Sequence, residues 1–291
     1  MFESIRNQPR RGTGRLLSAA DRAVAVEPEL ATIIGVQRDM RFRMGVVPWT
    51  LLVLLAASSL FSQDGVALFR KMQDALGGAE RIAGVRDYEE HVRAESWNGN
   101  TGQSLGEVRK RTRWIRPNHL RVDQIGPGST YVLYFDGTAG WEILPGTQKV
   151  VEITGGELAF ARSYIQGFAL NAWLADRDPG VWITSPSPNV VRVSDGDINH
   201  QYDLTLDPTT WLPLKKSSIS LSDPAHPIAS DDVTKEWETV QGIRFPRHWV
   251  VFRGSVRVAE ALDARHRVNS GLRLADLTEK PADFKPVLSP R

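Results

Sequence analysis

One short motif in the sequence matches the nucleophile pattern of a serine hydrolase. Gly102-Gln103-Ser104-Leu105-Gly106 fits the Gly-x-Ser-x-Gly spacing, in which the serine must lie on a sharp turn from a strand into a helix. Here strands are predicted on both sides of the motif, and no helix follows it. We therefore interpret the match as a turn between two strands and expect no acyl-transfer chemistry at Ser104.

Histidines and acidic residues are the other side chains that could bind a metal or move a proton. The six histidines are scattered, and none forms a helical two-histidine pair with a glutamate; they are His91, His119, His200, His226, His248 and His266. The run from Asp195 to Asn199 begins like a calcium loop, but His200 stands where glycine is needed and no closing glutamate follows. We interpret this run as a hairpin turn between Val193 and Tyr202.

These observations predict a protein that is not an enzyme and that holds no metal and no cofactor. The sequence contains no cysteine, which excludes disulfides, thiol catalysis and cysteine-bound zinc. It also contains no phosphate-binding loop and no dinucleotide fingerprint. Two arrangements would revive an enzyme: His200 beside Asp203 or Asp207, and a histidine within hydrogen-bond reach of Ser104.

An alternating run of arginines suggests a charged sheet face. Arg109, Arg111 and Arg113 have the period-two spacing of one strand face, with Lys110, Arg116 and Arg121 nearby. Such a face could meet lipid headgroups or an acidic partner. We favour a solvated face in which these arginines pair with acidic residues of the preceding strand, namely Glu89, Glu90 and Glu95.

Tryptophan is the most informative residue type after residue 63. Eight tryptophans lie there, seven of them in or beside predicted strands: Trp97, Trp114, Trp141, Trp173, Trp182, Trp211, Trp237 and Trp249. Their large apolar rings suit the lining of a cavity, and they suit an ordinary sheet core equally well. The residues alone leave both interpretations open.

The basic charge of the chain comes from its first 63 residues. The net charge is +2, and residues 1–63 contain eight arginines and five acidic residues, which leaves 28 basic and 29 acidic residues beyond them. That remainder has no overall charge that would attract nucleic acid. Residues 40–63 resemble a secretory signal peptide, with Arg41 and Arg43 before an apolar run from Gly45 to Ala57 and small residues after it. The run, about 17 residues at most, is short against the roughly 20 that cross a bilayer.

Two outcomes for this segment stay open. Cleavage would release residues 64–291 into the periplasm, and an uncleaved segment would anchor them to the inner membrane. Residues 1–39 fit neither outcome, because signal peptides begin near the protein start and Met40 or Met44 would give a conventional one. We expect residues 1–39 to be a mis-assigned start or a disordered tail.

The elements that must position these side chains are mostly antiparallel strands. Residues 64–76 carry a helical apolar stripe that ends at Gly77-Gly78, and a short helix is expected at 79–83. Turn residues then divide the chain into a first run of strands at 88–97, 105–115, 119–125, 131–135, 140–144 and 150–153, and a second run at 181–184, 190–193, 202–206, 215–221, 233–240, 244–252 and 256–268. Helices are expected between the two runs, at 157–176, broken near Gly167. In the last strand, Val256, Val258, Leu262, Ala264, His266 and Val268 are expected on one face, with Glu260 as the exception.

Four stretches, in this order, resemble the LolA/LolB-like family of periplasmic lipoprotein carriers. They are Leu76-Gly77-Gly78-Ala79-Glu80-Arg81-Ile82 after the first helix, Tyr134-Phe135-Asp136-Gly137-Thr138-Ala139-Gly140-Trp141, the segment from Leu204 to Leu214, and Val240-Gln241-Gly242-Ile243-Arg244-Phe245-Pro246, with Val268-Asn269 closing the last strand. The resemblance covers most of residues 64–285. It implies a mainly β, α+β fold: a strongly curved antiparallel sheet, or incomplete β-barrel, covered by helices.

The resemblance also implies a ligand site between the sheet and a helical lid. The candidates for an apolar cavity are Trp114, Val122, Leu133, Phe135, Trp141, Ile143, Trp237 and Trp249, and the lid candidates are Leu158, Ile165 and Phe168. Acyl chains bound there would need no catalytic group, because each methylene removed from water contributes about 0.8 kcal/mol.

The sequence therefore predicts a non-catalytic periplasmic carrier of lipid or lipoprotein acyl chains. Its expected partners are a lipid or an acylated lipoprotein, with an inner- or outer-membrane protein as a further candidate and no nucleic acid. The alternative is an envelope sensor or adaptor of the same fold that binds a membrane protein. Residues 64–285 are expected to form a single domain, followed by a tail at 286–291.

Overall fold

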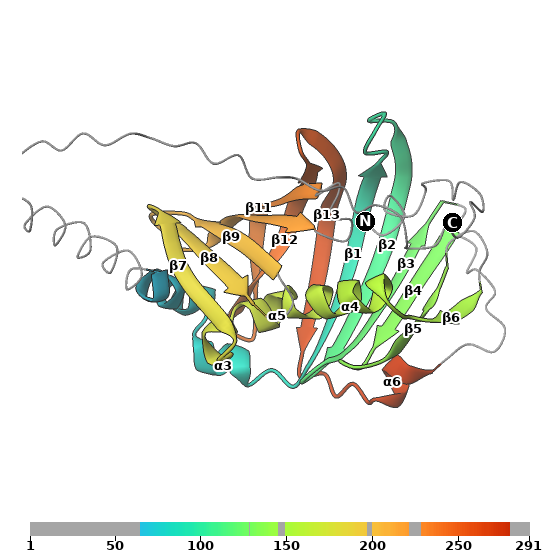
Figure 1. Ribbon diagram of the computed structural model, residues 1–291, viewed down its shortest axis with the longest axis horizontal. Helices are drawn as coiled ribbons and strands as arrows, with labels where there is room; N and C mark the ends of the chain where they lie inside the picture. Colours follow the sequence, from blue (N-terminus) through green and yellow to red (C-terminus); the bar gives the residue numbers. More distant parts are fainter. Residues whose placement is uncertain (1–64, 128, 145–148, 197–199, 221–227, 280–291) are drawn as a thin grey trace, which may run out of the picture.

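A single antiparallel sheet of 13 strands dominates the protein (Figure 1). The computed structural model describes residues 65–127, 129–144, 149–196, 200–220 and 228–279. The strand order across the sheet is β6-β5-β4-β3-β2-β1-β13-β12-β11-β10-β9-β8-β7, so the sheet is open and its edges are β6 and β7. The predicted fold class, a curved antiparallel sheet covered by helices, is confirmed.

The strands form two meanders that meet in the middle of the sheet. The first contains β1 (Asp87–Trp97), β2 (Ser104–Ile115), β3 (His119–Gly126), β4 (Ser129–Phe135), β5 (Gly140–Ile143) and β6 (Val150–Glu152). The second contains β7 (Val181–Ser187), β8 (Val190–Asp195), β9 (His200–Leu206), β10 (Pro213–Ser220), β11 (Ile228–Val240), β12 (Ile243–Arg253) and β13 (Val256–Val268). β1 and β13 pair antiparallel and join the two meanders.

Turn chemistry explains why neighbouring strands pair so closely in sequence. Between β4 and β5, the Asp136 carboxylate accepts hydrogen bonds from the backbone N–H groups of Thr138 and Ala139, at 2.8 Å each. Gly137 takes a φ of 102°, which is strained for any residue with a Cβ. The predicted hairpin between Val193 and Tyr202 is confirmed, because these two residues pair across β8 and β9.

Short helices cover one face and one end of the sheet. A helix over residues 65–76 is followed by α3 (Ala79–Ala83), and α4 (Gly156–Gln166), α5 (Ala169–Ala172) and a 3₁₀ helix, η1 (Ala175–Arg177), connect the two meanders. α4 and α5 run across the sheet in Figure 1. A last short helix, α6 (Ala275–Thr278), packs below β3 to β5 (Figure 1). Within the described ranges, no helix has the length and apolar character needed to cross a bilayer.

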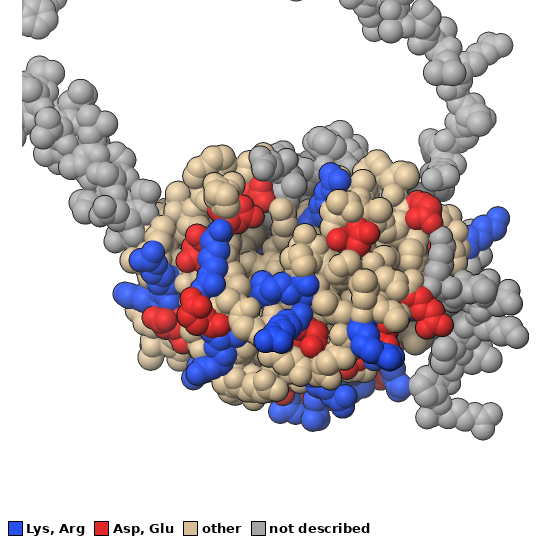
Figure 2. Space-filling model, turned by 90° about the horizontal axis from the view of Figure 1, so that it is seen from below, with Lys and Arg blue, Asp and Glu red and all other residues tan. Residues whose placement is uncertain are grey.

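The main hydrophobic core lies between the helices and the sheet face they cover, which we call the lid face. Phe69, Met72 and Leu76 of the first helix and Trp114, Leu120 and Phe135 of the sheet are fully buried there. A second, smaller cluster lies on the opposite face, the outer face, where Leu277 of α6 packs with Val132, Tyr134, Trp141 and Ile143. Seen from below, basic and acidic side chains are interspersed on the surface (Figure 2).

The strand predictions differ from the structure most at two places. β11 begins at Ile228, five residues before the predicted start at Val233. In β13 a register shift opposite Arg93 and Ala94 inserts Leu262 as an extra residue, so Asp263 pairs with Arg93 and Ala261 with Ala94. Leu262 is accordingly exposed and Ala261 buried, and the predicted single apolar face of this strand is wrong beyond the bulge.

Candidate functional site

The segment between β6 and β7 forms a lid over the lid face of the sheet. α4 starts after Gly155, whose φ of 56° suits glycine, and ends at Gly167, so both bounds follow from the glycines in the sequence. Ala161, Ile165 and Leu170 of this segment are buried in the main core. The predicted helical lid over 157–176, broken near Gly167, is thereby confirmed as a structural element.

An aromatic cluster joins the lid to the sheet. The ring of Phe168, between α4 and α5, lies 5.3 Å from the ring of Tyr88 in an edge-to-face arrangement and 5.7 Å from the ring of Trp114. Trp173, at the end of α5, lies 5.6 Å from Phe245 of β12. Aromatic pairs at such distances contribute about 0.5–1.5 kcal/mol beyond the area they bury. Phe168 itself is only partly buried, so this contact lies at the edge of the core.

The structure gathers most of the predicted cavity and lid residues in one place. Trp114, Val122, Leu133 and Phe135 are buried on the lid face, Ile165 is buried above them, and Trp237, Leu158 and Phe168 pack against the same cluster. These eight residues belong to, or pack against, one apolar cluster. The sequence candidates thus include a coherent group in which lid and sheet side chains face one another.

The other three predicted cavity residues lie elsewhere. Trp141 and Ile143 pack on the outer face against Leu277 of α6. Side chains that pair directly across strands share a face, and Trp141 pairs with Tyr134, which alternates with the lid-face residues Leu133 and Phe135. Trp249 packs with Val92, Ala261 and Ala264 in a separate cluster. The structure does not bring these three into the main cluster.

A polar network interrupts the lid face where apolar residues were expected. Glu90 is buried and accepts a hydrogen bond from the Thr112 hydroxyl at 3.0 Å, and the Lys110 ammonium lies 3.6 Å from the same carboxylate. The Tyr88 hydroxyl lies 2.7 Å from Nδ1 of His266 and 3.4 Å from Glu90. Burial and the Glu90 carboxylate raise the pKa of Tyr88 well above its usual value, so its hydroxyl stays protonated.

Lys110 connects this network to the lid. Its ammonium donates to the hydroxyl of Tyr164 in α4 at 3.1 Å. Burial lowers the pKa of this ammonium, but the contacts with Tyr164 and Glu90 outweigh burial and raise it, so Lys110 is charged. The prediction that Glu90 pairs with the alternating arginines is wrong, because Glu90 points to the lid face and the arginines to the outer face.

A second lysine reaches the lid from the other meander. Lys216 of β10 donates to the carbonyl oxygen of Gly167 at 2.8 Å, and its ammonium lies 4.8 Å from the centre of the Tyr202 ring. Burial lowers the pKa of Lys216, with neighbouring Asp232 opposing the shift, and burial likewise raises the pKa of Asp232. Two half-buried lysines, one from each meander, therefore hold the lid near its middle, at Tyr164 and Gly167.

The end of the lid is fastened to the first helices instead. Gln73 donates to the Trp173 carbonyl oxygen at 2.9 Å and to Asp176 at 2.8 Å. Arg177 pairs with Glu80 of α3 at 2.6 Å. The η1 end of the lid is therefore held by the first helices, whereas Lys110 connects α4 to the sheet.

Among the described side chains, Ser104, Asp203 and Asp207 make other contacts. The side chain of His200 lies outside the described residues, so its placement beside these aspartates stays a prediction. Ser104 donates to Glu95 at 3.1 Å in the β1–β2 hairpin. Asp203 forms two hydrogen bonds of 2.7 Å with Arg192, and Asp207 accepts backbone N–H groups from Thr209 and Thr210 in a turn. No group of three His, Asp or Glu side chains in the described ranges is arranged to hold a metal ion.

The sequence does not match any protein-family model, and a search of curated proteins finds no match. Solved structures do resemble the fold. A DUF1329 family protein from Desulfovibrio piger is 12% identical, with a TM-score of 0.50 over 75% of this chain and 97% of its own. A putative outer membrane lipoprotein-sorting protein domain from Vibrio parahaemolyticus is also 12% identical, with a TM-score of 0.50 over 74% of this chain and 97% of its own.

A LolA superfamily protein from Nitrosomonas europaea aligns with a TM-score of 0.45 and 12% identity over 72% of this chain and 97% of its own. At such identities these likenesses concern the fold. The predicted resemblance to lipoprotein-sorting proteins is therefore confirmed at the level of the fold: the open, helix-covered sheet of this chain is similar to that of the Vibrio parahaemolyticus domain.

Proposed function

We propose that the protein is a non-catalytic carrier that binds acyl chains of a lipid or lipoprotein between the sheet and the lid formed by α4 and α5. The observation that carries the proposal is the position of Phe168. Its ring stands at the edge of the core between Tyr88 and Trp114 and is only partly buried, on a lid whose α4 is connected to the sheet through Lys110. An acyl chain can take the place of this ring without breaking any backbone pairing of the sheet.

The energetics favour such an exchange. Burial of a chain of about eight methylenes contributes about 6 kcal/mol, at about 0.8 kcal/mol each. This exceeds the roughly 2 kcal/mol of the two aromatic contacts and the at most about 3 kcal/mol of ring burial that Phe168 would lose. The eight apolar residues that share the main core supply the walls, with Trp114, Val122 and Leu133 on the sheet side. Release of the acyl chain then requires the lid to return to its closed position. Ligand affinity therefore depends on the equilibrium between the lid-closed and lid-displaced states.

The proposal includes an envelope location and a domain organisation. The signal-like segment at 40–63 lies outside the described residues, so export rests on its sequence pattern and on the similarity to a putative lipoprotein-sorting domain. Residues 64–285 would act as one carrier domain in the periplasm. Its partners would be a lipid or an acylated lipoprotein, with a membrane protein as donor or acceptor.

Native mass spectrometry of the purified full chain tests the carrier function. We expect lipid or acylated peptide to co-purify, and an added fluorescent fatty acid to bind when the protein has been delipidated. Phe168→Glu should abolish binding of the fatty acid, because it places a carboxylate where the acyl chain must lie.

Trp97→Glu is the matched control, since Trp97 is also a partly buried aromatic residue but lies at the far end of β1, beneath Arg257. It should bind the fatty acid like the wild type. Equal binding by both variants, or a wild type that carries no lipid and ignores the probe, would refute the carrier function and favour a sensor or adaptor of the same fold.

A further inference from the structure

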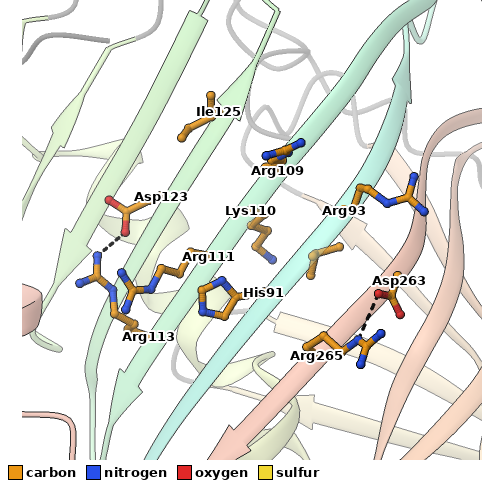
Figure 3. Close-up of a pocket in the computed structure, with 11 residues that line it drawn as sticks. His91, Arg93, Arg109, Lys110, Arg111, Arg113, Asp123, Ile125, Asp263 and Arg265 are labelled. Atoms are coloured by element: carbon orange, nitrogen blue, oxygen red, sulfur yellow. Dashed lines mark hydrogen bonds and ion pairs between the residues drawn. The ribbon is translucent and has the colours of Figure 1, made fainter. Parts of the chain in front are cut away.

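The outer face of the sheet carries a basic depression that the proposed carrier function does not use. It has a volume of about 530 Å³ and lies over β1, β2, β3 and β13 (Figure 3). Its lining includes Lys110, which contacts the lid, and the basic side chains of the outer face, which are Arg93, Arg109, Arg111, Arg113, Arg265 and His91. These side chains alternate along β2 with Lys110, Thr112 and Trp114 of the lid face, so the depression and the lid lie on opposite faces of the sheet.

Basic residues stand directly opposite other basic residues at four places across these strands. Arg93 pairs in register with Arg109, and His91 pairs with Arg111 on one side and with Arg265 on the other. Arg113 likewise faces Arg121. Like charges in directly opposite positions destabilise a sheet, whereas an acidic residue opposite each arginine would stabilise it. Three of these arginines also have an acidic residue opposite on their other side, namely Asp263 for Arg93, Asp123 for Arg111 and Glu89 for Arg113, so the repulsion is only partly offset.

Arginines outnumber carboxylates in the ion pairs of this face. Glu107 is shared by Arg93 and Arg109, and Asp263 is shared by Arg247 and Arg265. The same sharing holds for Glu89, which contacts Arg111 and His91, and for Asp123, which contacts Arg113 and Arg121. Seven arginines thus share four carboxylates, and three positive charges remain uncompensated within these ion pairs.

The arginines are placed to reach an incoming anion. Between 44% and 69% of the side chains of Arg93, Arg109, Arg111 and Arg265 is exposed. Beside them Arg113 is buried, and its Nε has no hydrogen-bond partner among the described residues. A guanidinium offers five N–H donors in a planar fork, so donors remain after each shared ion pair has formed.

We propose that this depression binds a phosphate-bearing group. Phosphate offers three or more oxygens around one centre, which suits several guanidinium forks converging from neighbouring strands better than the two oxygens of a carboxylate do. A depression also suits a single small charged group, which can enter it, better than a flat charged surface. The phosphate is that of a soluble phosphate compound or of a lipid headgroup, and both sources present the same chemistry to the arginines.

Isothermal titration of the full chain with inorganic pyrophosphate tests the site at low ionic strength. We expect binding that weakens about tenfold in Arg109→Gln and in Arg265→Gln, the loss of a charge-assisted hydrogen bond. Arg192→Gln is the matched control: Arg192 lies on β8, away from the depression, and pairs with Asp203. It should bind pyrophosphate like the wild type.

Vesicles separate the two sources of phosphate. If wild-type protein but not Arg109→Gln binds vesicles containing phosphatidylglycerol, and pyrophosphate does not bind, the lipid headgroup is the ligand. Phosphatidylcholine vesicles are the control and should not bind. A failure of both pyrophosphate and phosphatidylglycerol vesicles, or equal binding by Arg109→Gln and wild type, overturns the proposal. So does tighter binding of a polyglutamate peptide, which would indicate an acidic protein partner.

A second measurement separates this site from the carrier function and from misfolding. Arg109→Gln should melt no lower than the wild type, since it relieves the repulsion from Arg93, and it should bind the fluorescent fatty acid normally. Phe168→Glu should in turn keep pyrophosphate binding. Loss of fatty-acid binding in Arg109→Gln, or a clear drop in its melting temperature, would contradict the assignment of this arginine to a separate anion site.

Discussion

Trp114 is the residue on which most of the lid face depends. It is fully buried, it contacts Phe168 of the lid, and the Arg116 guanidinium lies 4.9 Å from the centre of its ring. We expect Trp114→Ala to lower the free energy of unfolding by about 3–5 kcal/mol, because it leaves a large cavity that its neighbours cannot fill. Urea denaturation monitored by circular dichroism measures this loss.

Trp182→Ala is the control for this prediction. Trp182 is 62% exposed, so its truncation should change the free energy of unfolding by no more than about 0.5 kcal/mol. Similar effects of the two substitutions would mean that Trp114 does not anchor the core.

Glu89 is the residue whose ionisation links the outer face to acid stability. Burial raises the pKa of Glu89, but hydrogen bonds and charge from Arg111 and His91 outweigh burial and lower it below the usual value. The folded state therefore binds this proton less readily than the unfolded state, so Glu89 stabilises the fold above the unfolded pKa of about 4.3, and this stabilisation is lost as the pH falls through the lower folded pKa.

Glu89→Gln should accordingly flatten the dependence of stability on pH in that acidic range. Melting temperatures measured from pH 7 down to pH 3 should fall less steeply for the variant than for the wild type. Parallel curves would show that the ion pairs of Glu89 do not contribute to acid unfolding.

At the scale of single residues, the sequence correctly predicted which β2 side chains share a face, but it did not predict the polar network on the lid face. The spacing of Arg109, Arg111 and Arg113 placed them on one face, as observed. The same alternation puts Lys110, Thr112 and Trp114 on the other face, and that signal for a polar network beside an apolar core was present in the sequence. Its partner Glu90 could not be assigned, because the strand pairing that brings Glu90 opposite Thr112 is a tertiary contact.

At the scale of elements, turn residues carried most of the information. Asp136-Gly137, Pro145-Gly146 and Gly155-Gly156 mark strand ends that the structure places within a few residues of the predicted bounds. The bulge at Leu262 was not predictable, since nothing in the local pattern distinguishes an inserted residue from the regular alternation. Trp141 was placed with the other cavity candidates because an apolar strand position does not reveal which of two buried faces it joins. Trp249 pairs with Ala261 on the lid face but packs in a cluster of its own, which no local pattern indicates.

The lid is the element whose stability the two lysines should control. Lys110→Met removes the hydrogen bond to Tyr164 and leaves Glu90 buried without its ammonium, so α4 should open more often. Hydrogen exchange followed by mass spectrometry should show faster exchange in α4, while the η1 end, held by Gln73, should keep wild-type protection. Equal acceleration at both ends would indicate general destabilisation instead of a loosened lid.

At the scale of the whole molecule, one close approach fastens the first helices to the second meander. Gly77 has a φ of 121°, and a Cβ added there would lie 2.2 Å from the carbonyl oxygen of Gly242 in the β11–β12 turn. Arg81 donates to the carbonyl oxygens of both glycines. The helical layer is thereby held against a hairpin that lies far along the chain.

Gly77→Ala should therefore destabilise the whole fold, by about 2–4 kcal/mol from backbone strain and the clash together. Gly78→Ala separates the two causes, because Gly78 also has a positive φ, of 96°, but a Cβ added there would meet no described atom within 4 Å. It should cost only the strain. Equal costs in thermal unfolding would show that the approach to Gly242 does not matter.

The strand order has a consequence for how the lid can move. The two terminal strands of the sheet in sequence, β1 and β13, are neighbours at its centre, while the lid runs from one edge strand, β6, to the other, β7. The chain is thus a ring in its connectivity, and the lid is the covalent bridge between the two rims of the sheet. Because the lid is attached to the sheet at both ends, it cannot rotate about one hinge. It can move away from the sheet only by bending outward or by an increase in the distance between the two edge strands. The curvature of the sheet and the distance between lid and sheet are then coupled, so a ligand that lifts the lid also flattens the sheet. Proteolytic cleavage of the lid would remove this coupling and leave the central strands paired.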